Sequence, residues 1–413
     1  MKLCGGQYGQ VADLKLNGEA EYPMMHVSST ARKLTRAAGW LARCAALSWA
    51  VSTGAAGAAA SPAGSAAAAS APAAKASATA VPARAASAAT APALCPETPQ
   101  LLGTAELRAL QRAQPAAPDR GLLWQVEKNG QRGWLYGTMH LGRKPWLQLG
   151  PRLQQALARV DVLALEVDLT DPRTQQEMAA TSRATAGKPV GAQADAQAAG
   201  RAGAAQPDPA AADAAPPDAR QQQRMAAQLQ RVCLPPQALA GAASHLQAAA
   251  LMVLAARSEG LHAEYGSERV LALLAKAQGK RVVAVEDVRS QTALLKGEDA
   301  QADAAQLDDA LDELESGRGL QQLRRLGVAW AAGDVDTLTR YHEWCDCIHS
   351  EADRQAQDRV LTARNGPMAD AFERLLREGQ SVLLAVGALH MVGPQGVAAE
   401  LSQRGYRVTR VVD

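Results

Sequence analysis

Two copies of the spacing Gly-x-x-His are the first residues in this 413-residue chain whose types and spacing point to chemistry. GTMH (137–140) and GALH (387–390) each follow directly on a short apolar run. Glycine can adopt a positive φ, which lets a chain leave a sheet sharply where a strand ends. We therefore expect turns at Gly137 and Gly387, and we expect His140 and His390 to lie just above the edge of a sheet.

Two glutamates have the same placement at the ends of apolar runs. Glu166 closes VLALE and Glu286 closes RVVAVE. If these strands run parallel in one sheet, the two carboxylates and the two imidazoles gather over its carboxyl edge, where open α/β sheets bind their ligands. Taken singly, each residue has a plain structural alternative, a hydrogen-bonded histidine or a solvated glutamate. Their repetition favours a functional site.

The elements that must position these residues can be read from the hydrophobic pattern. Apolar runs rich in β-branched residues predict strands, and the Asn129-Gly130 pair between the first two predicts a hairpin. Apolar residues spaced by threes and fours predict helices. The predicted strands are 122–128, 133–137, 161–168, 280–287, 381–387 and 406–412, and the predicted helices are 151–159, 221–231, 236–258, 265–278, 303–316, 320–331 and 350–363.

The pattern predicts an α/β fold. The runs VLALE, RVVAVE and VLLAV have apolar residues on both alternating sets of positions, as expected for strands that helices cover on both faces. Helical segments dominate from 221 to 377. We therefore expect a mixed, mostly parallel sheet flanked by helices, with an inserted helical subdomain.

Composition divides the chain into three parts. Residues 1–60 are expected to hold an N-terminal extension with a signal peptide or membrane anchor, because basic residues precede the apolar stretch 37–51. Residues 61–94 are almost wholly Ala, Ser and Pro and predict a disordered linker. The domain then spans 95–413, with a disordered insertion at 186–220. This order predicts a periplasmic or secreted location, with membrane attachment through the N-terminal segment as an alternative.

Charge and motifs exclude several classes of protein. The 43 Lys and Arg residues nearly balance the 41 Asp and Glu residues, and no basic stripe with interleaved aromatics is present. Nucleic acid is therefore not expected as a partner. The chain also lacks the Gly-x-Ser-x-Gly, His-Glu-x-x-His and Walker motifs of serine hydrolases, zincins and P-loop proteins.

Four cysteines remain after the predicted export signal, namely Cys95, Cys233, Cys345 and Cys347. An even number of cysteines in an exported chain predicts two disulfides. Cys345 and Cys347 lie close together in sequence, so we expect each to join Cys95 or Cys233. A zinc site formed by His342, Cys345, Cys347 and His349 is the alternative.

At these motifs the chain resembles the TraB/GumN/PrgY family, which includes the Tiki metalloproteases and is distantly similar to erythromycin esterases and haem-binding ChaN proteins. The resemblance covers about 95–413 without the insertion. It is carried by the segments 122–142, 161–172, 279–291, 363–369 and 382–397. Two Gly-x-x-His motifs and a strand-end glutamate, in this order, are the hallmark of the family.

The resemblance implies roles for individual residues. His140 and His390 are expected to be metal ligands or catalytic bases, and Glu166 a third ligand or the group that activates water. Glu286 is expected to support the site or to bind the metal. Arg364 and Asn365, predicted in a turn before a helix, could hold a substrate carboxylate or an oxyanion; a helix cap and a surface charge are their structural alternatives.

These roles together predict a hydrolase. Two imidazoles and one or two carboxylates suit a divalent transition metal, namely Zn, Mn, Co or Fe, which lowers the pKa of a bound water for attack on a peptide or small ester. The main alternative is a non-enzymatic protein that sequesters a peptide, a metal or haem. A third possibility is a metal-independent esterase in which one histidine is the general base. Oligomeric state is not predicted.

Overall fold

The computed structural model describes residues 95, 98–113, 115–184 and 217–412 of the chain. The predicted N-terminal extension with its signal segment (1–60), the predicted linker (61–94) and most of the predicted insertion at 186–220 lie outside the described residues. None of the helices in the described part is both long enough and apolar enough to cross a lipid bilayer.

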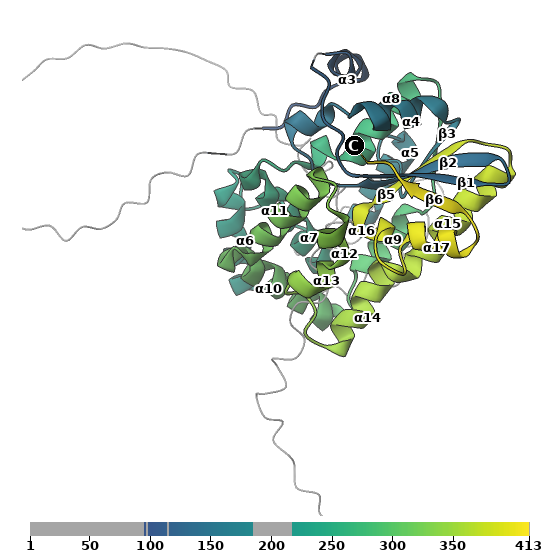
Figure 1. Cartoon of the computed structure of the whole chain (residues 1–413). Helices are drawn as coiled ribbons and strands as arrows, with labels where there is room; N and C mark the ends of the chain where they lie inside the picture. Colours follow the sequence, from purple (N-terminus) through teal and green to yellow (C-terminus); the bar gives the residue numbers. More distant parts are fainter. Residues whose placement is uncertain (1–94, 96–97, 114, 185–216, 413) are drawn as a thin grey trace, which may run out of the picture. The chain divides into compact units, whose positions relative to one another are not determined.

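A six-stranded mixed sheet forms the centre of the described domain, as predicted (Figure 1). The strands follow the spatial order β4-β3-β5-β2-β1-β6. The four neighbours β4, β3, β5 and β2 are parallel, whereas β1 is antiparallel to both β2 and β6. The strands are β1 (Leu122–Lys128), β2 (Gln131–Thr138), β3 (Val162–Leu165), β4 (Arg281–Ala284), β5 (Val382–Gly387) and β6 (Arg407–Arg410).

The hairpin between β1 and β2 has the predicted turn. Asn129 and Gly130 both adopt positive φ, 51° and 79°. A two-residue turn in which both residues have positive φ has a backbone twist that matches the twist of the two antiparallel strands it connects. The turn therefore fixes the register in which Lys128 faces Gln131.

The parallel strands are in a register that brings their carboxyl ends level. Leu165 of β3 pairs with both Ala284 of β4 and Ala385 of β5, and Ala385 also pairs with Tyr136 of β2. These four residues form one row across the sheet. Every side chain that follows a few residues later therefore emerges at the same edge.

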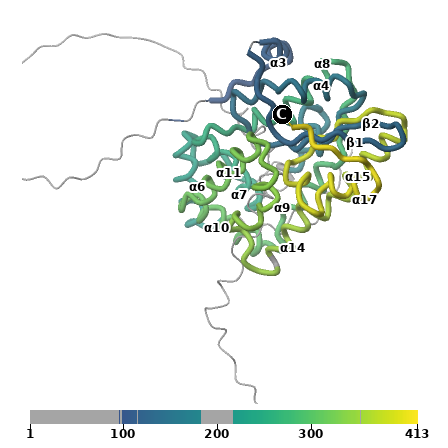
Figure 2. Tube along the Cα trace, in the orientation of Figure 1, coloured from purple at the N-terminus to yellow at the C-terminus, as the bar shows by residue number. Residues whose placement is uncertain are grey.

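Helices cover both faces of the sheet and form a separate group beside it (Figures 1 and 2). Helices α4 and α8 lie on one face, and α15 and α17 lie on the other, whereas α6, α7, α10 and α11 pack mainly on one another as the predicted helical subdomain. The helices are α3 (Thr104–Gln111), α4 (Pro151–Arg159), α5 (Pro172–Ala184), α6 (Ala219–Arg231), α7 (Ser244–Ala255), α8 (Ser267–Ala277), α9 (Val288–Leu295), α10 (Ala300–Ser316), α11 (Arg318–Ala331), α12 (Val335–Thr339), α13 (Tyr341–Trp344), α14 (Glu351–Val360), α15 (Thr362–Arg377), α16 (Ala388–Met391) and α17 (Val397–Gln403).

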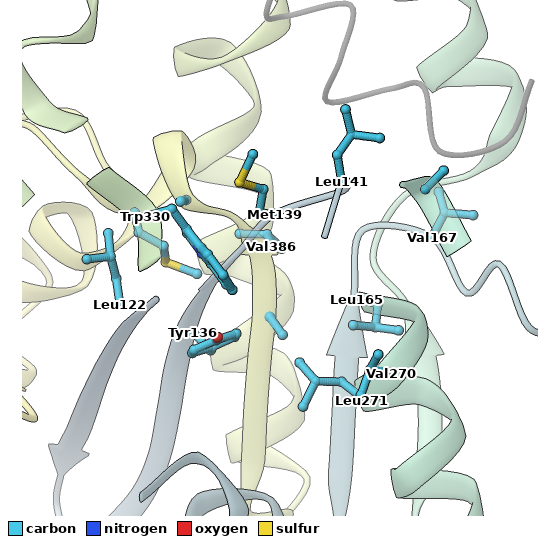
Figure 3. Packing of buried hydrophobic residues seen from close by; sticks show 14 of the residues in the cluster. Leu122, Tyr136, Met139, Leu141, Leu165, Val167, Val270, Leu271, Trp330 and Val386 are labelled. Carbon is cyan, nitrogen blue, oxygen red and sulfur yellow. The ribbon is translucent and has the colours of Figure 1, made fainter. Parts of the chain in front are cut away.

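The core lies between the sheet and these helices. Leu165 at the end of β3 packs beside Val270 and Leu271 of α8, and Trp330 of α11 lies near Met139 and the end of β5 (Figure 3). Trp330 is almost fully buried, and its indole N–H donates to the carbonyl oxygen of Gly137 at 2.8 Å. The indole thus ties α11 to the end of β2.

Two sequence predictions on the helical region are corrected. The helix predicted over 236–258 begins only at Ser244, because two prolines at 235–236 and Gly241 hold the preceding segment in turns. Arg364 and Asn365, predicted in a turn, lie in the first turn of α15 itself. Pro367 is the sixth residue of this helix, so α15 lacks the hydrogen bond that a backbone N–H at this position would donate to the carbonyl of Ala363.

The predicted pairing of the cysteines is wrong, although two disulfides are present. Cys95 joins Cys233 with Cα atoms 5.5 Å apart, and Cys345 joins Cys347 with Cα atoms 5.1 Å apart. Both separations suit a disulfide. The disulfide between Cys345 and Cys347 can form because Asp346, which lies between them, adopts a left-handed φ of 48° and folds the chain back. The sulfurs of the alternative zinc site are thus bonded to each other.

Candidate active site

The four strand-end residues predicted from the sequence meet over the carboxyl edge of the sheet. Glu166 follows β3 directly, and Glu286 lies two residues beyond β4. His140 lies two residues beyond β2, and His390 is in the short helix α16 that follows β5. Because the strand ends are level, these side chains converge although 250 residues separate the first from the last.

Arg364 from the first turn of α15 lies at the centre of this group. Its Nε donates to Glu286 Oε1 at 2.8 Å, and its Nη2 donates to Glu166 Oε2 at 2.7 Å and to Glu286 Oε2. Its Nη1 donates to the Val360 carbonyl at 2.7 Å and to His390 Nε2 at 3.2 Å. A guanidinium has five N–H donors, so every donor of Arg364 is engaged. One of these bonds must be released if Arg364 is to hold a substrate carboxylate, the role predicted for it.

Glu166 is held as a permanent anion. Its Oε1 accepts the backbone N–H of Gly387 at 2.6 Å, and its Oε2 accepts from Arg364 and, at 3.1 Å, from the amide of Gln291. Burial alone raises the pKa of this carboxyl, but Arg364 and the neighbouring histidines outweigh it and lower the pKa to about 2. Glu166 therefore cannot supply a proton near neutral pH.

His390 is fully buried and neutral. Burial, more than any other cause, lowers its pKa to about 4. Since Arg364 can only donate, His390 Nε2 accepts from it, and the ring proton lies on Nδ1, which is 2.8 Å from Asn365 Oδ1. Asn365 in turn donates to the Gln395 carbonyl at 2.7 Å. His390 and Asn365 therefore orient Arg364.

His140 is in a different electrostatic setting. Its Nδ1 lies 2.9 Å from Glu268 Oε1, and the carboxylate comes from the first turn of α8. Burial lowers the pKa of His140, but the charges of Glu268 and Glu166 outweigh it and leave the pKa above its usual value. With Nδ1 facing the carboxylate, Nε2 carries the lone pair of the neutral ring. This Nε2 has no hydrogen-bond partner among the described residues.

Both histidines and Glu166 border one small space beside Gly387. A Cβ atom at Gly387 would lie 3.3 Å from Glu166 Oε1, 3.4 Å from His390 Cδ2 and 4.0 Å from His140 Nε2. Gly387 has a φ of −47°, and Gly137 is not among the described residues with positive φ. The prediction that these two glycines are needed for a positive φ is thus wrong. They permit close approach, and at Gly137 a Cβ would lie 3.0 Å from Ala388 Cα.

An apolar pocket opens beside this space. It encloses about 520 Å³, its mouth included, and His140 and His390 contribute its polar wall with Thr138. The Thr138 hydroxyl is buried and, like His140 Nε2, has no hydrogen-bond partner among the described residues. The remaining walls are apolar and come from β2, α11, α16 and the segments beside them, namely Met139, Leu141, Leu323, Leu326, Trp330, Leu361, Ala388 and Leu389.

The predicted metal ligands do not fit a metal ion in this arrangement. His390 Nε2 faces an N–H of Arg364, and both oxygens of Glu166 accept hydrogen bonds. Within the described residues, no three His, Cys, Asp or Glu side chains are grouped so that they could hold a metal ion. The guanidinium of Arg364 occupies the position between the two glutamates that a divalent cation would need.

Three residues of the site were not predicted from the sequence. Glu268 and Gln291 lie on helices, and nothing in their positions along the sequence distinguishes them from other polar residues of those helices. Gln291 bridges Glu166 and Glu286, donating to the latter at 2.9 Å. Thr138 lies inside the first Gly-x-x-His motif, so its position was a signal that the sequence contained.

Comparison with known proteins identifies one related group. The family model described as the TraB/PrgY/gumN family matches residues 122–410, from the first strand of the sheet to the last. No similar curated protein and no similar solved structure was found.

Proposed function

Because the chain belongs to the TraB/PrgY/gumN family, we propose that it is a hydrolase of peptide or ester bonds in which His140 activates the attacking water. One observation carries the proposal. His140 Nε2 and the Thr138 hydroxyl have no hydrogen-bond partner among the described residues, and both residues line the same apolar pocket, beside the space shared with Glu166 and His390. Buried polar atoms without partners are rare and are typical of sites that bind a ligand.

The His140 and Glu268 pair has the arrangement of a general base and the group that orients it. The carboxylate of Glu268, 2.9 Å from Nδ1, stabilises through its charge the imidazolium that forms when Nε2 takes a proton from water. The same Nε2 then returns the proton to the leaving amine or alcohol. A general base of this kind contributes a rate factor of about 10² to 10⁴.

Thr138 is the donor available to the carbonyl that is attacked. Its hydroxyl is buried in the pocket wall and can donate to the oxygen that becomes negative in the transition state. The ionised Glu166 and the neutral His390 keep Arg364 in place, and Arg364 forms an ion pair with both Glu166 and Glu286. These residues thereby fix the electrostatic setting of His140.

A divalent transition metal remains a separate prediction, based on the family resemblance. It requires Arg364 to leave its position between Glu166 and Glu286. We further propose a peptide or small ester as substrate, and a periplasmic or secreted location with possible membrane attachment through the N-terminal segment. Nucleic acid is not proposed as a partner.

The proposal is tested by hydrolysis of a peptide library and of p-nitrophenyl esters. His140→Ala should lower kcat/KM by about 10² to 10⁴, whereas His349→Ala, at an exposed histidine outside the site, should leave it unchanged. Equal turnover in both variants contradicts the proposed role of His140.

Elemental analysis and chelation decide between the metal-free and the metal-dependent mechanism. Activity that survives a chelator supports His140 as a base acting without metal. About one transition metal ion per chain, lost in His390→Ala together with activity, supports the mechanism predicted from the sequence. Bound peptide, metal or haem without any turnover supports the sequestering protein.

A further inference from the structure

A second pocket, away from the proposed hydrolytic site, has an unusual concentration of arginines. It encloses about 550 Å³ with its mouth and lies where β1 begins, β6 ends and α11 leads into the next turn. Arg120, Arg152 and Arg410 line it, and Asp119 is the only acidic residue in its wall. The described wall thus carries three cationic groups and one anionic group.

The single acid is already engaged. Asp119 Oδ1 accepts the backbone N–H of Arg152 at 3.1 Å, at the first turn of α4, and Asp119 Oδ2 lies 3.9 Å from the Arg152 side chain. An anion at this helix N-terminus is favoured by the helix dipole. The negative charge of Asp119 is therefore offset by the N-terminus of α4 and by Arg152. No further acidic residue in the described pocket wall offsets the charges of Arg120 and Arg410.

Arg410 is held firmly without being neutralised. Its Nη1 donates to the carbonyls of Leu123 at 2.9 Å and Val411 at 3.1 Å, and its Nη2 lies 3.4 Å from the carbonyls of Gly121 and Gly333. Its Nε is buried and has no hydrogen-bond partner in the described part of the chain. Neutral carbonyls orient a guanidinium, but they do not cancel its charge.

Arg120 is held more loosely. Its one side-chain hydrogen bond is a long one, 3.4 Å to the Gln148 carbonyl. Neither Arg120 nor Arg410 forms an ion pair with any carboxylate of the described residues, and burial lowers the pKa of both. Partly buried charges are normally paired, because removing them from water costs free energy that only a partner offsets.

We propose that this pocket binds a small oxyanion, a carboxylate or a phosphate group, between Arg120 and Arg410. Guanidinium groups present their N–H donors in a planar fork that matches the oxygens of both anions. The anion supplies a negative charge that offsets the charges of Arg120 and Arg410. This site is independent of the proposed hydrolase activity.

The test is a titration of the full chain with inorganic phosphate and, separately, with sodium acetate, followed by thermal unfolding and calorimetry. Ionic strength is kept constant with sodium chloride, because screening alone changes the stability of charged surfaces. We expect a saturable rise in Tm with at least one of the two anions. The stronger of the two identifies the phosphate or the carboxylate as the natural group.

Variants connect the effect to the pocket. Arg120→Met should weaken binding about tenfold or more, the usual effect of losing one charge-assisted hydrogen bond, and Arg410→Lys should weaken it through loss of the fork. Arg407→Met is the matched control on the same strand, because Arg407 is exposed and already paired with Glu127. Its affinity should stay within about twofold of wild type, since no contact to the pocket is lost.

The free energy of unfolding, measured without added anion, tests the proposal independently of the affinity for the anion. Arg120→Met should then be at least as stable as the wild type, because an unneutralised charge has been removed. The proposal is overturned if neither anion gives a saturable shift, or if the shift survives in both Arg120→Met and Arg410→Lys.

Discussion

The same four-residue motif places two histidines in opposite electrostatic states. His390 is buried against Arg364 and stays neutral, whereas His140 is beside Glu268 and has a raised pKa. The difference comes from the residues that reach each ring from other elements. A repeated motif therefore does not imply a repeated role, and we assign proton transfer to His140 alone.

The role of His140 predicts a particular pH profile. A general base acts in its neutral form, so kcat/KM should rise with pH through the pKa of His140, which lies above 6.5. In Glu268→Gln the charge that raises this pKa is lost, and the rise should move to lower pH. The measurement is kcat/KM for a p-nitrophenyl ester between about pH 5 and pH 9, a range that brackets a histidine pKa. A rise at the same pH in both proteins contradicts the assignment.

His390 should make the folded state sensitive to acid. Its pKa is about 4 in the folded chain against 6.5 when unperturbed, so the unfolded chain binds more protons between these values. The stabilisation is present above pH 6.5 and is lost as the pH falls toward 4. A difference of this size corresponds to about 3 kcal/mol in the free energy of unfolding.

Urea unfolding of wild type and His390→Gln near pH 4.5 and pH 7.5 measures this effect. The variant should lose less stability on acidification, because glutamine does not titrate. His140 contributes with the opposite sign, since its raised pKa favours the folded state at low pH, but this contribution is common to both proteins. Equal losses in the two proteins are inconsistent with a neutral His390.

At the scale of elements, the start of α8 holds the loop that carries His140. Ser267 accepts the backbone N–H of Met139 at 2.8 Å and returns its own N–H to the Met139 carbonyl at 3.0 Å. Gly266, just before the helix, packs against the His140 carbonyl so closely that a Cβ there would lie 2.4 Å from the oxygen. The contact between His140 and Glu268 therefore depends on how α8 is seated.

The substitution Gly266→Ala should push the start of α8 away from the loop that carries His140. The added methyl group must displace the His140 backbone, so we expect a loss of about 1–3 kcal/mol in stability, typical of overpacking, and a fall in kcat/KM. The matched control is Gly103→Ala, because Gly103 is likewise the N-cap residue of a helix, α3, and a Cβ there would come no closer than 3.6 Å to another residue. That change should cost less than about 1 kcal/mol, the small preference for glycine over alanine at an N-cap, and should leave kcat/KM unchanged. Thermal unfolding and ester hydrolysis measure both effects.

The sequence was sufficient to predict the strands and their shared edge, because apolar runs, the Asn129-Gly130 turn and the polar residues after each run are local signals. It was not sufficient to predict which charges meet there. Arg364 reaches Glu166 across 198 residues, and Glu268 is an ordinary acid in the first turn of a helix until α8 is placed against His140. The pairing of Cys345 with Cys347 depended on a left-handed backbone at Asp346, which residue type does not reveal.

At the scale of the whole molecule, the fold separates a sheet that holds the proposed chemistry from a helical subdomain that supplies one wall of the apolar pocket. Leu323, Leu326 and Trp330 of α11 form that wall. The subdomain can thus change the fit of a substrate without altering His140 or Glu166. We expect Leu326→Arg to raise KM for apolar esters more than it lowers kcat, which steady-state kinetics will measure.

The disulfide between Cys95 and Cys233 has a consequence for a chain cut by a protease. It closes a loop over 138 positions of sequence, which contains β1, β2, β3 and His140. A single peptide bond broken anywhere inside that loop leaves two fragments that are still covalently tethered. Such a nicked protein should migrate as one band on a denaturing gel without reductant and as two bands with it.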